Sequence, residues 1–195
     1  MRRQGMNLMI LFIVITAPVI LHAQSYTTNG AAKIEVVGTS NIHDWTLTSS
    51  YGTCTSTVGT DASGILTSMT NLGFTMTMTN LKSTHGGTMD NNAYKAMAAD
   101  KYPTIKFNST SVTVKSNGGG NYSITAPGKL SISSGSKDVT LVATGKMNAD
   151  KSISVSGSYA LVTTDYNVKP ISIMLGAIKT SANVTINYTL TMKPQ

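Results

Sequence analysis

The sequence predicts an all-β domain in which about eight antiparallel strands close into a barrel, with one short helix in a connection. Three observations predict this fold. Threonine, serine, valine and isoleucine are abundant, and only 12% of residues are charged, which favours strands over a helical bundle. Apolar and polar residues alternate along most of the chain, and turn-forming residues separate the alternating segments. With 41% hydrophobic residues in 195, the chain has enough apolar material for the core of one domain.

The alternation marks the individual strands. Leu72, Phe74 and Met76 alternate with polar or small residues, and Ile186 and Tyr188 do the same near the C-terminus. Such a period of two gives an antiparallel sheet one apolar and one polar face. The segments expected to form strands are 32–40, 43–56, 64–82, 103–115, 121–134, 137–148, 152–165 and 182–193.

Short connections rich in glycine, asparagine and serine separate several of these strands. Segments 117–121, 133–136 and 148–151 have the composition of hairpin turns. Eight antiparallel strands of about ten residues can close into a barrel whose interior is either packed or holds one small ligand. Closure also removes the exposed edges of an open sheet.

One connection is predicted to be helical, at 88–100. This segment is rich in helix formers, and it ends before Pro103, which disfavours continuation. Met89, Ala93 and Met97 share one face with Ala96. The helix is expected either to cover a sheet edge or barrel end, or to act as a lid at a barrel mouth.

A second connection, 165–180, is too long for a hairpin turn and too apolar for a solvated loop. Loops of this length are often lids or binding loops. Its apolar residues are expected to be buried, either against the barrel wall or against a bound apolar molecule. They are Ile171, Ile173, Met174, Leu175 and Ile178.

The N-terminus has the pattern of a secretory signal peptide, which is assigned to residues 1–23. Arg2 and Arg3 precede an apolar run at 8–21, and a small residue stands at the expected cleavage position. The run is shorter than the roughly 20 residues of a membrane-spanning helix, which makes a permanent anchor the weaker alternative. The mature domain is expected to be 24–195, in the periplasm or secreted.

The residues give little support for catalysis, and the protein is not expected to be an enzyme. Catalysis needs an acid, base or nucleophile beside a partner, and no such group is evident. His43 is expected either to face the interior or to lie in a turn with a local hydrogen bond, and His85 to be exposed in a loop. Cys54 is expected to be buried and inert, or to pair between chains. No metal or cofactor is expected.

The basic residues do not indicate nucleic acid as a partner. The formal net charge is +7, but both arginines, Arg2 and Arg3, lie in the predicted signal peptide. Specific recognition of phosphate or guanine usually relies on arginine. The dispersed lysines instead suit a soluble exported protein, and one or two at a barrel mouth would favour an anionic head group or transient contact with a membrane surface.

The apolar faces of several strands alternate large and very small residues. Small residues halfway along a strand leave unfilled volume unless large neighbours intrude, in which case the barrel has an ordinary packed core. An empty apolar cavity stays dry and accepts apolar guests. The alternating sets are Ile124/Ala126/Gly128/Leu130, Leu141/Ala143/Gly145 and Val155/Gly157/Tyr159.

Seven segments, taken in order, resemble the YceI-like family of secreted bacterial proteins. The branch most similar to this sequence carries a Gly-Thr-Ser…His-Asp-Trp signature in its first strands, as at 38–45 here. The resemblance covers nearly the whole predicted mature chain. The matching segments are 38–45, 89–97, 101–107, 128–132, 137–141, 164–170 and 176–180.

The resemblance implies an extended lipocalin-like barrel of eight antiparallel strands with a helix in one connection. It also implies that a long polyisoprenoid chain binds inside the barrel. The sequence departs from the family pattern at Val162-Thr163, where a Lys-Met pair is common, and at Pro170-Ile171 and 173–175, where a second proline and aromatic residues are frequent. These departures leave the identity of the ligand open.

The combined hypothesis is a protein that binds, and transports or sequesters, an amphiphilic isoprenoid-like lipid in the cell envelope. The alternatives are a small outer-membrane β-barrel, whose apolar faces would point outward, and a secreted structural or stress-related module without a ligand. Oligomeric state is not indicated. The candidate ligand-binding residues are Trp45, Phe74, Met76, Met78, Met97, Phe107, Ala143, Gly157, Tyr159, Ile173, Met174, Leu175, Ile186 and Tyr188.

Overall fold

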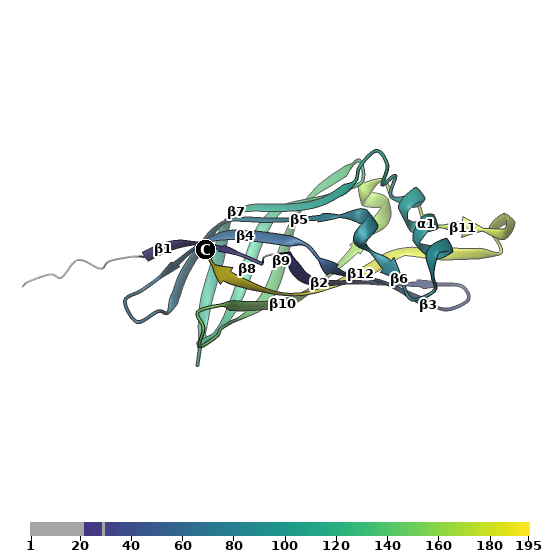
Figure 1. The fold of residues 1–195 in the computed structure, drawn as a ribbon. Coiled ribbons are helices and arrows are strands. Elements are labelled where there is room, and N and C mark those ends of the chain that lie inside the picture. Colours follow the sequence, from purple (N-terminus) through teal and green to yellow (C-terminus); the bar gives the residue numbers. More distant parts are fainter. Residues whose placement is uncertain (1–21, 29) are drawn as a thin grey trace, which may run out of the picture.

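A computed structural model describes residues 22–28 and 30–195 (Figure 1). Eight antiparallel strands form a closed ring in the order β1-β4-β5-β7-β8-β9-β10-β12, and β12 pairs back with β1. This confirms the predicted all-β fold. The strands of the ring are β1 (His22–Thr27), β4 (Thr53–Thr60), β5 (Leu66–Thr77), β7 (Thr104–Gly118), β8 (Asn121–Ile132), β9 (Gly135–Met147), β10 (Ile153–Val162) and β12 (Ile178–Pro194).

Two further long strands, β2 (Ala31–Ser40) and β3 (Asp44–Tyr51), extend the wall beside β12. β2 follows β1 along the same edge of β12: Thr27 is opposite Lys193, and Ala32 is opposite Leu190. β3 pairs with β2 and leads into β4. Each of the pairs β1/β2 and β3/β4 is therefore one bent strand of the barrel.

The segment 43–56, predicted as a single strand, bends at Gly52 into β3 and β4. The N–H of Gly52 donates to Gly30 O at 3.1 Å. A Cβ at this position would lie 2.8 Å from the ring of Phe74, so a larger residue here would displace the aromatic ring. Strand β1 was not predicted, because its first residues fall within the predicted signal peptide. Apart from His22 and Ala23, that segment lies outside the described residues.

The two ends of the barrel differ (Figure 1). The C-terminus and β1 lie at one end, the terminal end. The other, the helix end, carries α1 (Gly87–Ala96), β11 (Ser172–Ile173) and the turn between β2 and β3. β6 (Lys82–Ser83) pairs with β3 there. Three short 3-10 helices complete the structure: η1 (Met78–Asn80), η2 (Thr163–Tyr166) and η3 (Met174–Gly176).

Helix α1 is shorter than the predicted 88–100. It ends because Ala98 takes a left-handed conformation (φ 50°), and its N–H donates to Lys95 O at 3.1 Å. The predicted apolar face packs against the core: Ala93 and Met97 are buried, at 4% and 8% exposed, and Met89 and Ala96 are half-buried. At the first turn, Asp90 accepts a hydrogen bond from Ser83 N at 2.6 Å. The helix is thereby held across the end of the barrel.

Candidate ligand-binding cavity

The barrel encloses an apolar space, the inner cavity, of about 140 Å³. Engineered apolar cavities of similar size stay dry and bind small apolar guests. Inward-facing side chains of the ring and of β2, together with Leu81 between η1 and β6, form its walls. They are Ile34, Val36, Cys54, Met69, Leu72, Phe74, Met76, Leu81, Ile105, Phe107, Ile124, Ala126, Leu130, Leu141, Ala143, Val155, Tyr159, Ile186, Tyr188, Leu190 and Met192.

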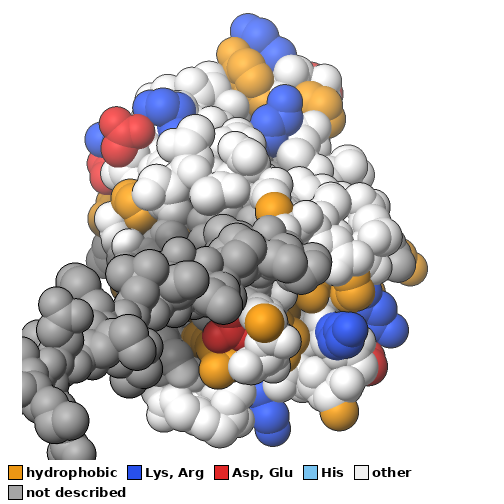
Figure 2. All heavy atoms as spheres, turned by 90° about the vertical axis from the view of Figure 1, so that its left-hand side faces the viewer, with side chains coloured by type: hydrophobic (Ala, Val, Ile, Leu, Met, Phe, Trp, Pro, Cys, Tyr) orange, Lys and Arg blue, Asp and Glu red, His pale blue; other side chains and the backbone are white. Residues whose placement is uncertain are grey.

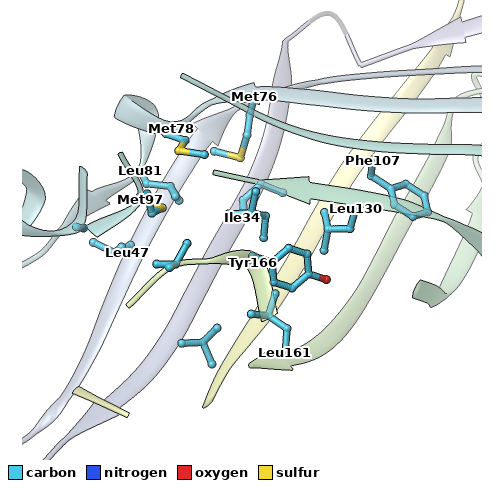
Figure 3. Packing of buried hydrophobic residues seen from close by; sticks show 14 of the residues in the cluster. Ile34, Leu47, Met76, Met78, Leu81, Met97, Phe107, Leu130, Leu161 and Tyr166 are labelled. Carbon is cyan, nitrogen blue, oxygen red and sulfur yellow. The ribbon is translucent and has the colours of Figure 1, made fainter. Parts of the chain in front are cut away.

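A second space, the outer cavity, has about 100 Å³ and adjoins the first on the side of the helix end. Val36, Leu81, Ile105 and Ile186 line both cavities. Figure 3 shows the buried residues around this junction, with Ile34, Met76 and Leu81 surrounding the interior. The two cavities together, here called the shaft, run from the middle of the barrel to α1 and the connection after η2.

The walls of the shaft show that the alternating apolar residues face inward. The outward positions of the same strands carry mostly threonine, serine and lysine. This is the reverse of the arrangement expected of the outer-membrane alternative, in which apolar residues would face outward. No helix in the described part of the chain is long and apolar enough to cross a membrane.

The small residues on the inner faces do not all leave empty volume. A Cβ at Gly157 would lie 2.3 Å from Tyr188 Oη, so the phenol covers this glycine. The Tyr188 hydroxyl donates to Val142 O at 3.1 Å, which fixes the ring there. Phe107 covers Gly128 in the same way. The expectation of open space at Gly157 was therefore wrong, and the remaining void lies beside Ala126 and Ala143.

Most of the predicted ligand-binding residues are brought together around the shaft. Trp45 and Met97 line the outer cavity, and Ile186 lines both. Met78 lines neither: it is fully buried beneath the helix end and packs in the core (Figure 3). The predicted residues on the inner cavity are Phe74, Met76, Phe107, Ala143, Tyr159, Ile186 and Tyr188.

The connection 165–180 does not bury its apolar residues as predicted. Of the five residues predicted to be buried, only Ile171 reaches the outer cavity, next to Val168, Lys169 and Pro170 of the same connection. Ile173, Met174 and Leu175 are 37%, 73% and 110% exposed. The cause is local: Ile173 pairs with Ile178 in a tight reversal, and Met174 and Leu175 in its turn have left-handed backbone conformations. These three residues do not line the shaft.

Polar groups that the sequence did not single out gather at the outer cavity. Thr163, Lys169, Thr180 and Ser181 contribute to its wall. The Thr163 hydroxyl oxygen is buried and has no hydrogen-bond partner among the described residues. An unpaired buried hydroxyl is unfavourable unless a ligand or water satisfies it. The shaft is therefore apolar inside and has polar groups at its helix end.

Cys54 lies on the inner cavity and is 3% exposed. Burial raises the pKa of its thiol to about 12. We expect alkylation by iodoacetamide at pH 8 to be very slow in the folded protein, because on the order of one thiol in ten thousand is ionised. Mass spectrometry with and without denaturant measures this. Rapid labelling of the folded protein at pH 8 would contradict the burial.

His43 and His85 lie together at the surface of the helix end. The ring centroids of His43 and His85 are 4.9 Å apart. His43 lies in the β2–β3 turn, where its Nδ1 is 2.7 Å from Asp44 O, so the predicted local hydrogen bond is present and the ring does not enter the barrel. Within residues 22–28 and 30–195, no group of three or more metal-ligating side chains is found.

Comparison with known proteins assigns the chain to a family. The model of the YceI-like domain matches residues 24–192. The chain belongs to the YceI-like family. No curated protein matches the chain.

Solved structures share the YceI-like fold at low sequence identity. A polyisoprenoid binding domain from Saccharophagus degradans, implicated in plant cell wall breakdown, is 9% identical and has a TM-score of 0.63. The match covers 88% of this chain and 99% of that one. BcnA of Burkholderia cenocepacia is 18% identical with a TM-score of 0.58, covering 83% of this chain and 96% of the other. At these identities the similarity concerns the fold.

Proposed function

We propose that this YceI-like domain binds one amphiphilic isoprenoid-like lipid, with the hydrocarbon chain in the shaft. The observation that carries the proposal is the pair of adjoining apolar cavities inside a closed barrel. Each Å² of apolar surface removed from water contributes about 25 cal/mol, so a branched chain along the shaft gains affinity with its length. The polyisoprenoid binding domain with the same fold supports this ligand class.

The distribution of polar groups orients the lipid. The inner cavity is lined by hydrocarbon side chains, with Cys54 and the phenols of Tyr159 and Tyr188 as its polar atoms. Thr163 and Lys169 lie at the outer cavity. We therefore place the tail in the inner cavity and the head group at the helix end, where a hydrogen bond to the Thr163 hydroxyl and the charge of Lys169 favour an oxygen-rich head.

The biological role we propose is non-enzymatic transport or sequestration of this lipid in the cell envelope. The predicted signal peptide supports export to the periplasm or beyond. A closed barrel shields a chain that would otherwise be exposed to water, and a binding protein needs no catalytic group for this. The alternative module without a ligand differs from this proposal in one measurable property, the presence of lipid.

The test is to purify the protein from its native source, extract it with organic solvent and identify the extract by mass spectrometry. We expect an isoprenoid-like lipid close to one per protein molecule. Refolded, delipidated protein should take up a polyprenol, and quenching of Trp45, the single tryptophan, reports occupancy of the outer cavity. Native protein without lipid, together with no uptake of the polyprenol, would overturn the proposal.

Thr163→Val tests the placement of the head group. Removing the unpaired hydroxyl is expected to leave the lipid-free protein as stable as before or more stable by about 1 kcal/mol. Affinity for a polyprenol is expected to fall about three- to tenfold, while affinity for the corresponding hydrocarbon without a hydroxyl stays unchanged. Thermal unfolding and the Trp45 titration measure the two effects. An equal loss for both ligands would place the head group elsewhere.

A further inference from the structure

The helix end carries a projecting group of aliphatic side chains, here called the apolar tip. It consists of Ile42, Ile173, Met174 and Leu175. Leu175 is fully exposed, Met174 is 73% exposed and Ile42 is 59% exposed. Figure 1 shows β11 and the turn after it projecting past α1 at this end of the barrel. Large aliphatic side chains exposed together indicate a surface that another apolar phase covers.

The tip is built from two connections that are fixed to each other. Asn41, next to Ile42, makes three hydrogen bonds with Ala177 and Lys179, where the connection enters β12. Its N–H donates to Lys179 O at 3.1 Å, its side-chain amide donates to Ala177 O at 2.8 Å, and its side-chain oxygen accepts from Lys179 N at 2.8 Å. The left-handed backbone of Met174 and Leu175 (φ 52° and 54°) is uncommon for such residues and is held in this turn.

Two lysines lie close to the apolar tip. The side chain of Lys179 lies over Gly176, the residue directly after Leu175. Its Cε is 3.3 Å from the position that a Cβ on Gly176 would take. Lys169 is exposed on the same connection. The acidic residue of this connection, Asp165, is 3.9 Å from Lys137 and is therefore partly neutralised. Aliphatic residues flanked by lysines are the composition of segments that enter the interface of an anionic membrane.

We propose that the apolar tip docks the domain onto the surface of an anionic lipid bilayer. Met174 and Leu175 would enter the boundary between head groups and acyl chains, and Lys169 and Lys179 would contact the anionic head groups. A protein partner fits less well. Binding energy at protein interfaces is concentrated in Trp, Tyr and Arg within large well-packed patches, whereas the tip is aliphatic and confined to two turns.

The same connection links the tip to the shaft. Lys169, Pro170 and Ile171 line the outer cavity, and Met174 follows three residues after Ile171. Docking at the tip brings the polar end of the shaft to the membrane surface. A lipid would then pass between bilayer and barrel with little exposure to water. This last step rests on the proposed function, but the docking itself does not.

Co-sedimentation with vesicles tests the docking. Vesicles of phosphatidylglycerol and phosphatidylethanolamine are compared with vesicles of phosphatidylcholine alone, using the full mature chain. We expect binding to the anionic vesicles that weakens with salt. The double variant Met174→Asp/Leu175→Asp should reduce the bound fraction at least tenfold, and Lys169→Gln/Lys179→Gln should remove most of the preference for anionic vesicles.

Matched controls come from the opposite, terminal end. Figure 2 shows lysines and hydrophobic side chains scattered on the visible part of that end. Ile65, in the β4–β5 turn, is 47% exposed, and Lys115 and Lys146 are exposed near the β7–β8 turn. Ile65→Asp and Lys115→Gln/Lys146→Gln are expected to bind vesicles like the parent protein.

Three outcomes are informative. Loss of vesicle binding in the tip variants alone supports the proposal. Equal binding by tip and control variants, or no binding by the parent protein, overturns it. Lipid extraction from the same protein preparations, before vesicles are added, separates the two proposals. A protein that carries no lipid but sediments with vesicles retains the docking and refutes the carrier function.

Discussion

Ala143→Phe is expected to lower lipid loading at least tenfold while the barrel still folds. Ala143 lies on β9 with its methyl group on the inner cavity, beside the void that remains after Tyr188 has filled the space at Gly157. A phenyl ring at this position occupies space that the lipid tail requires. The ring also overpacks its surroundings, at a cost of typically 1–3 kcal/mol. A tenfold loss of affinity corresponds to about 1.4 kcal/mol, which exclusion of a few methylene groups exceeds.

The control is one residue away. Val142 is 58% exposed on the outer face of the same strand, and its carbonyl accepts the Tyr188 hydrogen bond through the backbone, which a side-chain change preserves. Val142→Phe therefore adds an aromatic ring to β9 without entering the shaft. Loading is measured by polyprenol titration and by mass spectrometry of extracts, with circular dichroism to establish folding. Parent-like loading of Ala143→Phe would show that the lipid lies elsewhere.

The barrel could be predicted because period-two alternation is a local property of each strand. Leu72, Phe74 and Met76 indicate their own inward face without knowledge of any partner. The way in which the ring closes was harder to predict from the sequence. It depends on β1, whose first residues fall within the predicted signal peptide, and on the bend at Gly52, where the ring of Phe74 packs close to the backbone. Both are contacts between segments distant along the chain.

The candidate site was predicted in part for the same reason. The alternation along each strand identifies Met76, Ala143 and Ile186 as inward-facing residues, and they line the shaft. The alternation does not indicate that Tyr188 covers Gly157. That contact depends on how the Tyr188 side chain on β12 is oriented toward the neighbouring strand β10. The alternation also gives no information on irregular connections, so the exposure of Leu175 and the polar groups at the outer cavity became visible only in three dimensions.

Gly135→Ala is expected to destabilise the protein more than other single-methyl additions. Gly135 begins β9, and a Cβ there would lie 2.3 Å from Cα and 2.7 Å from O of Tyr166 in η2. These are backbone atoms, so no side chain can rotate away. Either the β8–β9 turn or η2 must move, and Tyr166, which is 2% exposed, would lose its packing. We expect a loss of about 2–4 kcal/mol, which lowers the Tm by about 5–15 °C.

Gly87→Ala is the matched control, because the same methyl group is added where no atom lies within 4 Å. Gly87 is the first residue of α1, where alanine is the better helix former. The Tm of Gly87→Ala should therefore equal that of the parent protein or be slightly higher. Since η2 carries Thr163 to the outer cavity, Gly135→Ala should also release bound polyprenol faster than Gly87→Ala does. Equal Tm values for the two variants would show that η2 is not packed against the β8–β9 turn, and the outer cavity would then lack the wall on which the placement of the head group depends.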